Sequence, residues 1–254
     1  MKKALVFVCL FTLFQTAVFA QPGVISHRGS WKNTQHPQNS IAALQAAIDQ
    51  KVWGSEFDVH LTKDDILVVN HDHDFYGLEI EELTYEELLA KKHPNGESIS
   101  TAREYLEAGL KQKNTKLIFE LKTSRISKER TMEAVAQSLK LVKEFKAQKQ
   151  VEFIAFDWDA CLKYRELDKK VKIHYLNGDK TPTEVAAAKL TGIDYHVNIF
   201  KKNPGLIQDF KDLGLKTNSW TVNQEEDMEL LIENGIDYIT TDEPELLNRL
   251  LNKN

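Results

Sequence analysis

Two kinds of hydrophobic pattern alternate along the chain. Short apolar runs rich in β-branched residues predict strands, and longer stretches with an apolar residue every three or four positions predict helices. The predicted strands are residues 24–28, 54–60, 116–121, 151–156, 171–176, 193–198, 215–222 and 236–241. The predicted helices are residues 40–50, 128–147, 159–168, 183–190, 204–213 and 224–234. Strands separated mostly by helices, in this number, favour the α/β fold of a (β/α)8 TIM barrel over a doubly wound open sheet, which stays the structural alternative.

Polar residues and glycines mark the ends of several predicted helices. Asn39 or Ser40 is expected to cap the first helix, and Asn223 the helix over residues 224–234, because short polar side chains accept hydrogen bonds from free backbone N–H groups. Gly214 and Gly235 follow helix ends, where the chain commonly turns left-handed.

One further apolar run, residues 66–70, breaks the alternation of strands and helices. Only "TKDD" separates it from the strand over residues 54–60, and a parallel crossover needs a dozen residues or more. The two runs therefore predict a hairpin that carries "NHDHD" back to the end of the barrel where the first of them emerged. The charged stretch that follows, about residues 74–114, is interpreted as an inserted subdomain over the barrel mouth.

The first 20 residues have the pattern of a secretory signal peptide. Two lysines precede a short apolar core, and small or medium residues lead to an expected cleavage after Ala20. The apolar core is too short for a membrane span, and Cys9 lacks the small residue expected before a lipidated cysteine, so no stable membrane anchor is expected. The mature chain, residues 21–254, is then one periplasmic or secreted domain in which Cys161 has no disulfide partner.

The charge of the chain narrows the choice of partners. Its formal net charge is −5, and loss of the two signal-peptide lysines takes it to −7. An acidic surface argues against a nucleic-acid partner and is compatible with divalent-cation binding. The oligomeric state is left open.

Three carboxylates stand at strand positions that face one way. Glu56 and Asp58 lie two residues apart in "SEFDVH", so both project to one face, and Glu120 shares a face with Lys122 in "IFELK". Carboxylates inside a barrel repel one another unless they are protonated or bind a cation. Such hard oxygen ligands select Ca²⁺ or Mg²⁺, with Mn²⁺ as a third choice, over zinc. The alternative is an inverted pattern, with both carboxylates of the first strand in solvent.

Two histidines are placed to join these carboxylates. His27 ends the first predicted strand, and His71 returns on the hairpin. Imidazoles suit acid and base catalysis near neutral pH, one taking a proton from the nucleophile and one giving a proton to the leaving group. Arg28 and Lys122 supply positive charge for an anionic small-molecule substrate, of which a phosphate diester fits best.

The ordered motifs resemble those of a known family. "HRG", "EFDVHLTKDDILVVNHD", "FELK", "WTVN" and "GIDYITTDEP" resemble, in this order, the motifs of the glycerophosphodiester phosphodiesterases, over essentially the whole mature chain. The resemblance implies a TIM barrel with a small insertion after the histidine-bearing hairpin. It also implies metal-dependent hydrolysis of glycerophosphodiesters to sn-glycerol 3-phosphate and an alcohol.

The resemblance further implies a role for each residue that matches a family motif. Carried over by position, these are the acid/base pair His27 and His71, the metal ligands Glu56, Asp58 and Glu120, the phosphate contacts Arg28 and Lys122, and the pocket aromatic Trp220. For Trp220, a purely structural role as a buried barrel aromatic is the alternative.

The loop after "HRG" departs from the family pattern. Many members have Glu-Asn-Thr there, whereas this chain has Gln38, Asn39 and Ser40, so the size and hydrogen-bonding ability are kept without the negative charge. The neutral Gln38 is the one feature that favours a non-catalytic periplasmic phosphodiester-binding protein.

Two enzymatic alternatives are weaker. A phospholipase D-type phosphodiesterase acting on lysolipids would need an apolar patch around the mouth, and the predicted insertion is mostly charged. A retaining glycosidase using Glu56 and Glu120 would leave the paired histidines and Arg28 unexplained.

Overall fold

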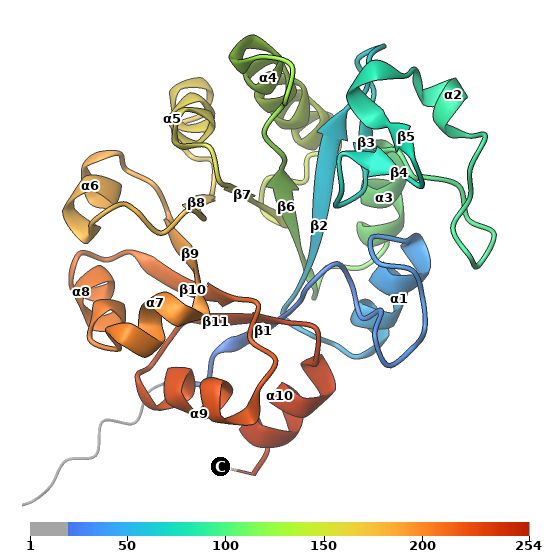
Figure 1. The fold of residues 1–254 in the computed structure, drawn as a ribbon. Coiled ribbons are helices and arrows are strands. Elements are labelled where there is room, and N and C mark those ends of the chain that lie inside the picture. The colour runs from blue at the N-terminus through green and yellow to red at the C-terminus, as the bar shows by residue number, and fades with distance from the viewer. Residues whose placement is uncertain (1–19, 254) are drawn as a thin grey trace, which may run out of the picture.

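A closed barrel of eight parallel strands forms the centre of the molecule in the computed structural model, which describes residues 20–253 (Figure 1). The barrel strands are β1 (Gly23–Ser26), β2 (Gly54–Leu61), β6 (Lys116–Leu121), β7 (Val151–Ala155), β8 (Ile173–Tyr175), β9 (Gly192–His196), β10 (Lys216–Trp220) and β11 (Tyr238–Thr241). The barrel closes because β1 pairs in parallel with both β11 and β2. The predicted TIM barrel is confirmed. The predicted signal peptide lies outside the described residues, apart from Ala20.

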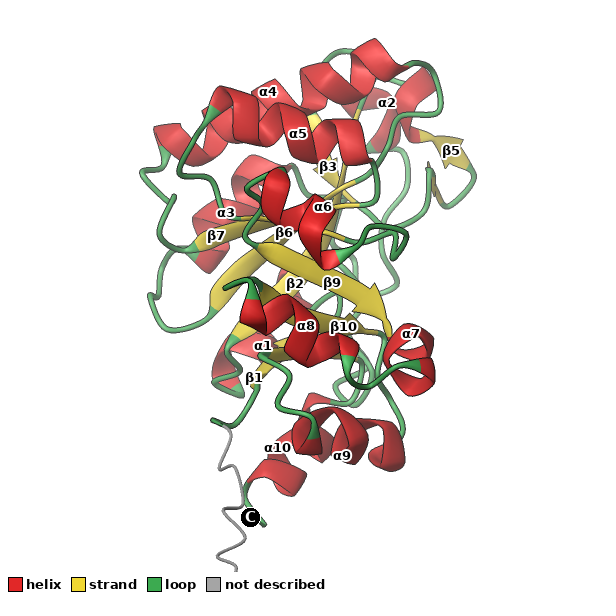
Figure 2. Ribbon diagram, turned by 90° about the vertical axis from the view of Figure 1, so that its left-hand side faces the viewer, coloured by secondary structure: helices red, strands yellow, loops and turns green. Residues whose placement is uncertain are grey.

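Helices surround the barrel, as the side view shows (Figure 2). They are α1 (Ile41–Asp49), α2 (Tyr85–Leu88), α3 (Ala102–Gly109), α4 (Lys128–Glu144), α5 (Trp158–Leu167), α6 (Pro182–Ala187), α7 (Val197–Lys202), α8 (Leu206–Asp212), α9 (Glu225–Glu233) and α10 (Pro244–Leu251), with a short 3-10 helix at Ile80–Glu82. Each of the six predicted helices overlaps one of these, and α2, α3, α7 and α10 are not among the predicted helices. Among residues 20–253, none of the helices combines the length and the hydropathy that a membrane-spanning helix needs.

The helix ends show which sequence signals were correct. Ser40 caps α1 by accepting a hydrogen bond from the backbone of Ala43, and Gly214 and Gly235 adopt the expected left-handed conformation after α8 and α9. The prediction for Asn223 was wrong, because Gln224 occupies the cap position of α9 and the Asn223 side chain bonds elsewhere.

The predicted strand over residues 193–198 runs into a helix at its C-terminal end. Residues 197 and 198 begin helix α7 instead of continuing β9, because the ring of His196 accepts a hydrogen bond from the backbone N–H of Asn198 and caps that helix.

The apolar core has two layers. Outside the barrel, alternate strand residues pack against the helices, as where Phe57 stacks on Tyr105 of α3 with ring centroids 4.4 Å apart. Inside the barrel, Ile25, Ile118 and Ile154 are buried together with Leu176. This inner layer fills the lumen. Inward-facing polar side chains that follow it along the strands therefore lie at the C-terminal end of the barrel.

The predicted hairpin is confirmed, since β3 (Leu67–Val69) pairs antiparallel with β2. The expected insertion, about residues 74–114, contains two parts. The hairpin of β4 (Asp74–Phe75) and β5 (Leu78–Glu79) lies with α2 beside β3 at the rim, over an apolar cluster of its own (Figure 1). Helix α3, by contrast, packs into the main core as one of the barrel helices.

Glu152 of β7 forms a buried charged network inside the barrel. It lies at the opposite end of the lumen from Glu56, Asp58 and Glu120. Burial alone would raise its pKa, but hydrogen bonds from His174 and Lys172 outweigh burial and lower the pKa of Glu152 to about 2 from an ordinary value of 4.5. A carboxylate with a depressed folded-state pKa stabilises the fold above its unfolded-state pKa, and this stabilisation is lost as the pH falls from about 4.5 towards 2.

Glu152→Gln should therefore destabilise the fold by roughly 1–3 kcal/mol at pH 7. Urea denaturation of both proteins at a series of pH values would measure the difference. It should shrink as the solution is acidified below pH 4.5, the ordinary pKa of the carboxyl. A difference that stays constant down to pH 3 would contradict a contribution from the ionised carboxylate.

Candidate active site

Three carboxylates converge at the C-terminal end of the barrel lumen. Asp58 of β2 stands opposite Glu120 of β6 in the sheet register, and Glu56 lies two residues earlier on β2. One oxygen of each lies within 4.8 Å of the others, and all three side chains are buried. The alternative in which Glu56 and Asp58 face solvent is therefore wrong.

The electrostatics of this cluster favour a bound cation. Burial and the neighbouring charges of Asp58 and Glu120 raise the pKa of Glu56 well above its ordinary value, and burial with the charge of Asp58 raises the pKa of Glu120 to about 7. Glu56 Oε1 has no hydrogen-bond partner among the residues that the structure describes. Three crowded carboxylates with an unpartnered oxygen are a donor set that a hard divalent cation would satisfy, so these residues fit the predicted metal.

Lys122 lies within this cluster. Its Nζ is 2.7 Å from Asp58 Oδ1 and 2.6 Å from Glu120 Oε1. Burial would lower the pKa of Lys122, but the two carboxylates outweigh burial and raise that pKa above its ordinary value, so the ammonium stays charged. The pKa of Asp58 shifts in the opposite direction. Burial would raise it, but Lys122, His71 and Arg28 outweigh burial and hold that pKa well below its ordinary range. The contact between Lys122 and a phosphate stays a prediction.

The turn after β1 presents Arg28 to the same cluster. Its backbone N–H donates to Glu56 Oε2 at 2.8 Å, and its guanidinium Nη1 donates to Gln38 Oε1 at 2.6 Å. Arg28 and Gly29 both have positive φ, and a Cβ on Gly29 would lie 2.6 Å from the carbonyl carbon of Ala43. The glycine of "HRG" thus lets the chain turn sharply against α1, and the neutral Gln38 holds the arginine.

Asn39 orients Asp58, a role that the sequence analysis missed. Its Nδ2 donates to Asp58 Oδ2 at 2.8 Å, and its Oδ1 accepts from the backbone N–H of Asp58 at 3.1 Å. Asn39 has a φ of 62°, so the left-handed backbone turns its amide away from α1 and towards β2. The polar residue was interpreted as a helix cap, and nothing in its spacing distinguishes the two roles.

His27 follows directly after β1 and is held by a second residue that was missed. Its Nδ1 lies 2.8 Å from Asp242 Oδ1, just beyond β11. Asp242 also accepts hydrogen bonds from Trp31 Nε1 and from Asn223 Nδ2. Burial would raise the pKa of Asp242, but the hydrogen bond and charge of His27 outweigh it and lower that pKa. The "TTDEP" motif marked this aspartate without indicating its partner.

His71 follows β3 and is held in a similar way. Its Nδ1 lies 2.7 Å from Asp72 Oδ1, and its backbone carbonyl lies 3.1 Å from His60 Nε2. Burial lowers the pKa of His71, although the charge of Asp58 opposes this. With Nδ1 bonded to a carboxylate in both His27 and His71, Nε2 is the nitrogen left to exchange a proton with a bound molecule.

Trp220 packs at the mouth of the lumen. Its Nε1 donates to the carbonyl of Asp194 at 3.1 Å, and its ring meets Phe156 edge to face with centroids 5.4 Å apart. The side chain is half-buried above the apolar layer of the lumen. This packing supports a structural role, and contact with a substrate stays a prediction.

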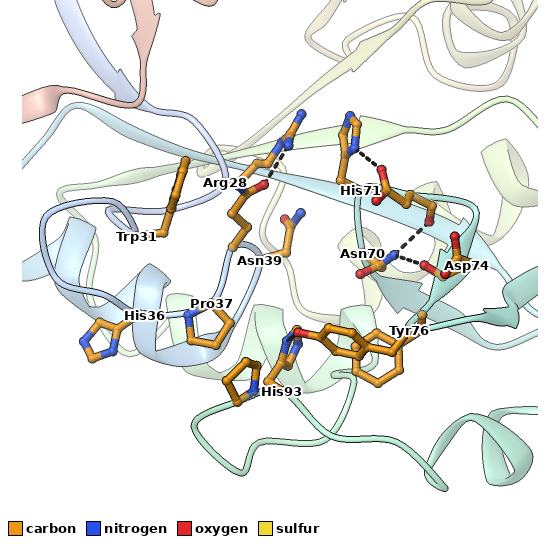
Figure 3. A pocket seen from close by; sticks show the side chains of 14 residues that line it. Arg28, Trp31, His36, Pro37, Asn39, Asn70, His71, Asp74, Tyr76 and His93 are labelled. Atoms are coloured by element: carbon orange, nitrogen blue, oxygen red, sulfur yellow. Dashed lines mark hydrogen bonds and ion pairs between the residues drawn. The ribbon is translucent and has the colours of Figure 1, made fainter.

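Two hollows flank His71 at the barrel mouth. The first, of about 470 Å³, lies between the loop after β1 and the β4–β5 hairpin, with Arg28 and His71 at one side and Tyr76 and His93 at another (Figure 3). The second, of about 490 Å³, is lined by Lys122, Glu120 and Arg125. The two hollows share His71, Asp72 and Asp74 in their linings, so they lie side by side at the mouth.

A family model and a sequence relative both match this chain to glycerophosphodiester phosphodiesterases. Residues 27–246 match the family model described as "Glycerophosphoryl diester phosphodiesterase family". A glycerophosphodiester phosphodiesterase of Caldanaerobacter subterraneus subsp. tengcongensis is 32% identical over 245 residues, which cover 91% of this chain and 98% of that protein.

Solved structures agree with the sequence match. A glycerophosphodiester phosphodiesterase from Parabacteroides distasonis superposes with a TM-score of 0.89 at 42% identity, covering 92% of this chain and 98% of that one. An Oleispira antarctica phosphodiesterase in complex with the product sn-glycerol-3-phosphate shares the fold, with a TM-score of 0.80 at 24% identity over 91% of this chain and 97% of that one.

Proposed function

The chain belongs to the glycerophosphoryl diester phosphodiesterase family and is an enzyme of that class, and we propose that it hydrolyses glycerophosphodiesters to sn-glycerol 3-phosphate and an alcohol. The observation that carries the proposal is the convergence of a buried carboxylate triad with Arg28, Lys122 and two carboxylate-bound histidines at one end of the barrel. The acid/base pair and the metal site are part of the proposal.

Glu56, Asp58 and Glu120 would hold the cation, for which Ca²⁺ or Mg²⁺ is the proposed identity and Mn²⁺ a third choice. When bound, a divalent cation supplies positive charge that polarises the phosphate and stabilises charge developing on its oxygens.

Arg28 and Lys122 would bind the non-bridging phosphate oxygens. Arg28 is well placed for this because its backbone and its guanidinium are fixed by Glu56 and Gln38. The Arg28 guanidinium can bind a phosphate while the neutral amide of Gln38 still holds it. In this proposal, catalysis therefore does not need a charged side chain at position 38.

The two histidines divide the proton transfers in this proposal. One imidazole accepts a proton at Nε2 from the attacking oxygen, and the other donates a proton to the departing alkoxide. The attacking oxygen belongs either to water or to the neighbouring glycerol hydroxyl, and the hydroxyl route gives a cyclic phosphate first. Detecting or failing to detect that cyclic phosphate by ³¹P NMR during turnover distinguishes the two routes.

Asp242 is a positioning residue in this scheme, since it acts on the substrate only through His27. Asp242→Asn should lower kcat by about 10- to 100-fold because the imidazole loses its fixed orientation and tautomer. KM should change little, since no substrate contact is removed. Steady-state kinetics that separate kcat from KM would measure this.

Asp72→Asn is the matched control, because Asp72 bonds to His71 in the same way but is 75% exposed. Water can replace an exposed carboxylate, so the control should lose less activity than Asp242→Asn. An Asp242→Asn enzyme whose only defect is a raised KM would contradict the positioning role.

The proposed function is tested by substrate turnover. Purified protein is incubated with glycerophosphocholine, glycerophosphoethanolamine and glycerophosphoinositol, with EDTA or with added Ca²⁺ or Mg²⁺, and sn-glycerol 3-phosphate is measured. Release that depends on the metal supports the proposal. No cleavage across a broad diester panel would instead support a phosphodiester-binding protein, and choline release from intact lysophosphatidylcholine would support the phospholipase D-type alternative.

We also propose that the enzyme is exported, on the basis of the signal-peptide pattern in residues 1–20. N-terminal sequencing of the protein recovered from the periplasm or medium should begin at Gln21. An intact Met1 in protein found only in the cytoplasm would contradict export.

A further inference from the structure

The hairpin tip of the insertion places an aromatic side chain at the hollow beside His71. Tyr76 is the first residue of the two-residue turn between β4 and β5, with a φ of 51°, and Gly77 follows with a φ of 87°. A bulky residue with positive φ is uncommon and costs conformational energy, so an interaction of its side chain should offset that cost. Burial of the side chain does not offset it, because Tyr76 is 49% exposed.

Packing positions the Tyr76 ring without covering it. Its ring meets Phe75 edge to face, and its hydroxyl lies 3.2 Å from His93 Nδ1. The ring stands across the hollow from Trp31, as the close view shows (Figure 3). Trp31 is itself fixed through its Nε1, which donates to Asp242. Phe75 and His93 hold the Tyr76 ring from within the lining of the hollow, and Asp242 holds Trp31 from outside it. Both rings are thus positioned while ring surface stays free to contact a ligand.

The charges in this hollow favour a positively charged ligand group. Asp72 and Asp74 contribute carboxylates to its lining. Arg28 is the one lysine or arginine among its described lining residues, and its guanidinium is already engaged by Gln38 and by Asp58, 3.5 Å away. Aromatic faces combined with carboxylates attract organic cations, and quaternary ammonium groups above all.

The hollow on the other side of His71 has a different character. Lys122 and Arg125 line it together with Glu120 and with Asp72 and Asp74, which both hollows share. Its aromatic wall is the single Phe156 apart from histidines. A cationic group placed there would meet Arg125 and the Lys122 ammonium and could contact one aromatic ring, whereas Trp31 and Tyr76 both line the first hollow. A substrate with a neutral end and a cationic end on either side of its phosphate is therefore bound more favourably with the cation on the Tyr76 side.

We propose that the hollow between Trp31 and Tyr76 binds the alcohol that leaves, and that it selects a cationic amino alcohol over a neutral polyol, with Tyr76 as a specificity-determining residue. This inference rests on the proposed function, because it assigns one end of the diester to a place beside the catalytic histidines. It places the glycerol in the hollow lined by Lys122 and Arg125.

Tyr76→Leu tests the inference, with Tyr76→Phe as the matched control. The leucine variant should lose about five- to ten-fold in kcat/KM for glycerophosphocholine, the size of one cation–π contact, mainly through KM. For glycerophosphoglycerol, whose leaving alcohol is neutral, it should retain nearly the wild-type value. The phenylalanine variant keeps an aromatic face and should retain the preference for choline.

A second measurement needs no variant. Choline and its neutral isostere 3,3-dimethyl-1-butanol are compared as inhibitors of the wild-type enzyme acting on glycerophosphoglycerol. Choline should inhibit at several-fold lower concentration, since only the cation gains from the rings and carboxylates.

The outcomes separate this inference from the proposed function. A wild-type enzyme that cleaves no glycerophosphodiester defeats the proposed function and the inference with it. An active enzyme in which Tyr76→Leu impairs both substrates equally or neither, or in which the two inhibitors are equally potent, defeats the inference alone.

Discussion

Replacing His27 or His71 with alanine should lower kcat/KM for glycerophosphodiesters by about 10²- to 10⁴-fold, the range expected when a positioned acid or base is removed. Each imidazole stands at the end of a barrel strand or its hairpin with Nδ1 bonded to a carboxylate, so each presents one nitrogen to the substrate. Because the two proton transfers belong to one reaction, the double variant should be little worse than the more impaired single variant.

The fold should survive both substitutions. The His27 side chain is 15% exposed and that of His71 is 38% exposed, and neither belongs to the carboxylate triad. Thermal unfolding and titration with Ca²⁺ or Mg²⁺ should therefore give nearly wild-type values for both variants. His36→Ala is the matched control, because His36 lines the mouth without a proposed proton transfer, and it should retain activity to within a few-fold.

Near-normal turnover in either His27→Ala or His71→Ala would show that the acid/base assignment is wrong for that residue. Loss of activity accompanied by loss of metal binding would instead show that the histidine maintains the carboxylate site. Both measurements are needed to distinguish the two roles.

The barrel and its carboxylate triad could be predicted because they depend on local periodicity. Side chains two apart on a strand share a face, so Glu56 and Asp58 had to point together once β2 was recognised. The length of "TKDD" alone required an antiparallel return, which brought His71 back to the mouth. Neither inference needed knowledge of distant contacts.

The residues that orient the site could not be found in this way. Asp242 lies 215 positions from His27 in the chain, and the contact depends on barrel closure between β1 and β11. Asn39 reaches Asp58 only because its backbone is left-handed, and helix capping gave its polar side chain a sufficient explanation in the sequence. Periodicity identifies which face a side chain occupies, whereas these two roles depend on which loop lies beside it.

The structure gives Gln38 a more definite role than its sequence position did. Its amide oxygen holds the Arg28 guanidinium, so the residue acts by positioning a cation. A carboxylate there would neutralise part of the charge that Arg28 offers to a phosphate, whereas an amide leaves that charge whole. The substitution is thus compatible with catalysis and gives no reason to favour a binding protein.

Removing the metal from the carboxylate triad gives the second large expected effect. The three buried carboxylates repel one another, and a bound cation would relieve that repulsion. EDTA should abolish turnover of the wild-type enzyme, and Ca²⁺ or Mg²⁺ should restore it. A metal that binds only the folded chain stabilises it by about 2.7 kcal/mol when its free concentration is a hundred times Kd, which raises the melting temperature by several degrees.

Glu56→Gln should separate catalysis from stability. The amide keeps an oxygen that can accept from the Arg28 backbone, but it removes one negative charge from a buried cluster that includes Asp58 and Glu120. Activity should therefore fall by about 10²-fold or more, because the cation is held less tightly and the phosphate loses that stabilisation. In EDTA, however, the variant should be at least as stable as the wild type, since repulsion between carboxylates is relieved.

Asp194→Asn is the control for this experiment. Asp194 is also a buried carboxyl in the lumen, and burial raises its pKa well above its ordinary value, but it does not belong to the triad. Its variant should keep the metal-induced rise in melting temperature that Glu56→Gln loses. Calorimetry with and without EDTA compares the three proteins. If Glu56→Gln kept the full metal-induced rise, or were less stable than wild type in EDTA, its carboxylate would serve the fold, and the metal site would have to be sought elsewhere at the mouth.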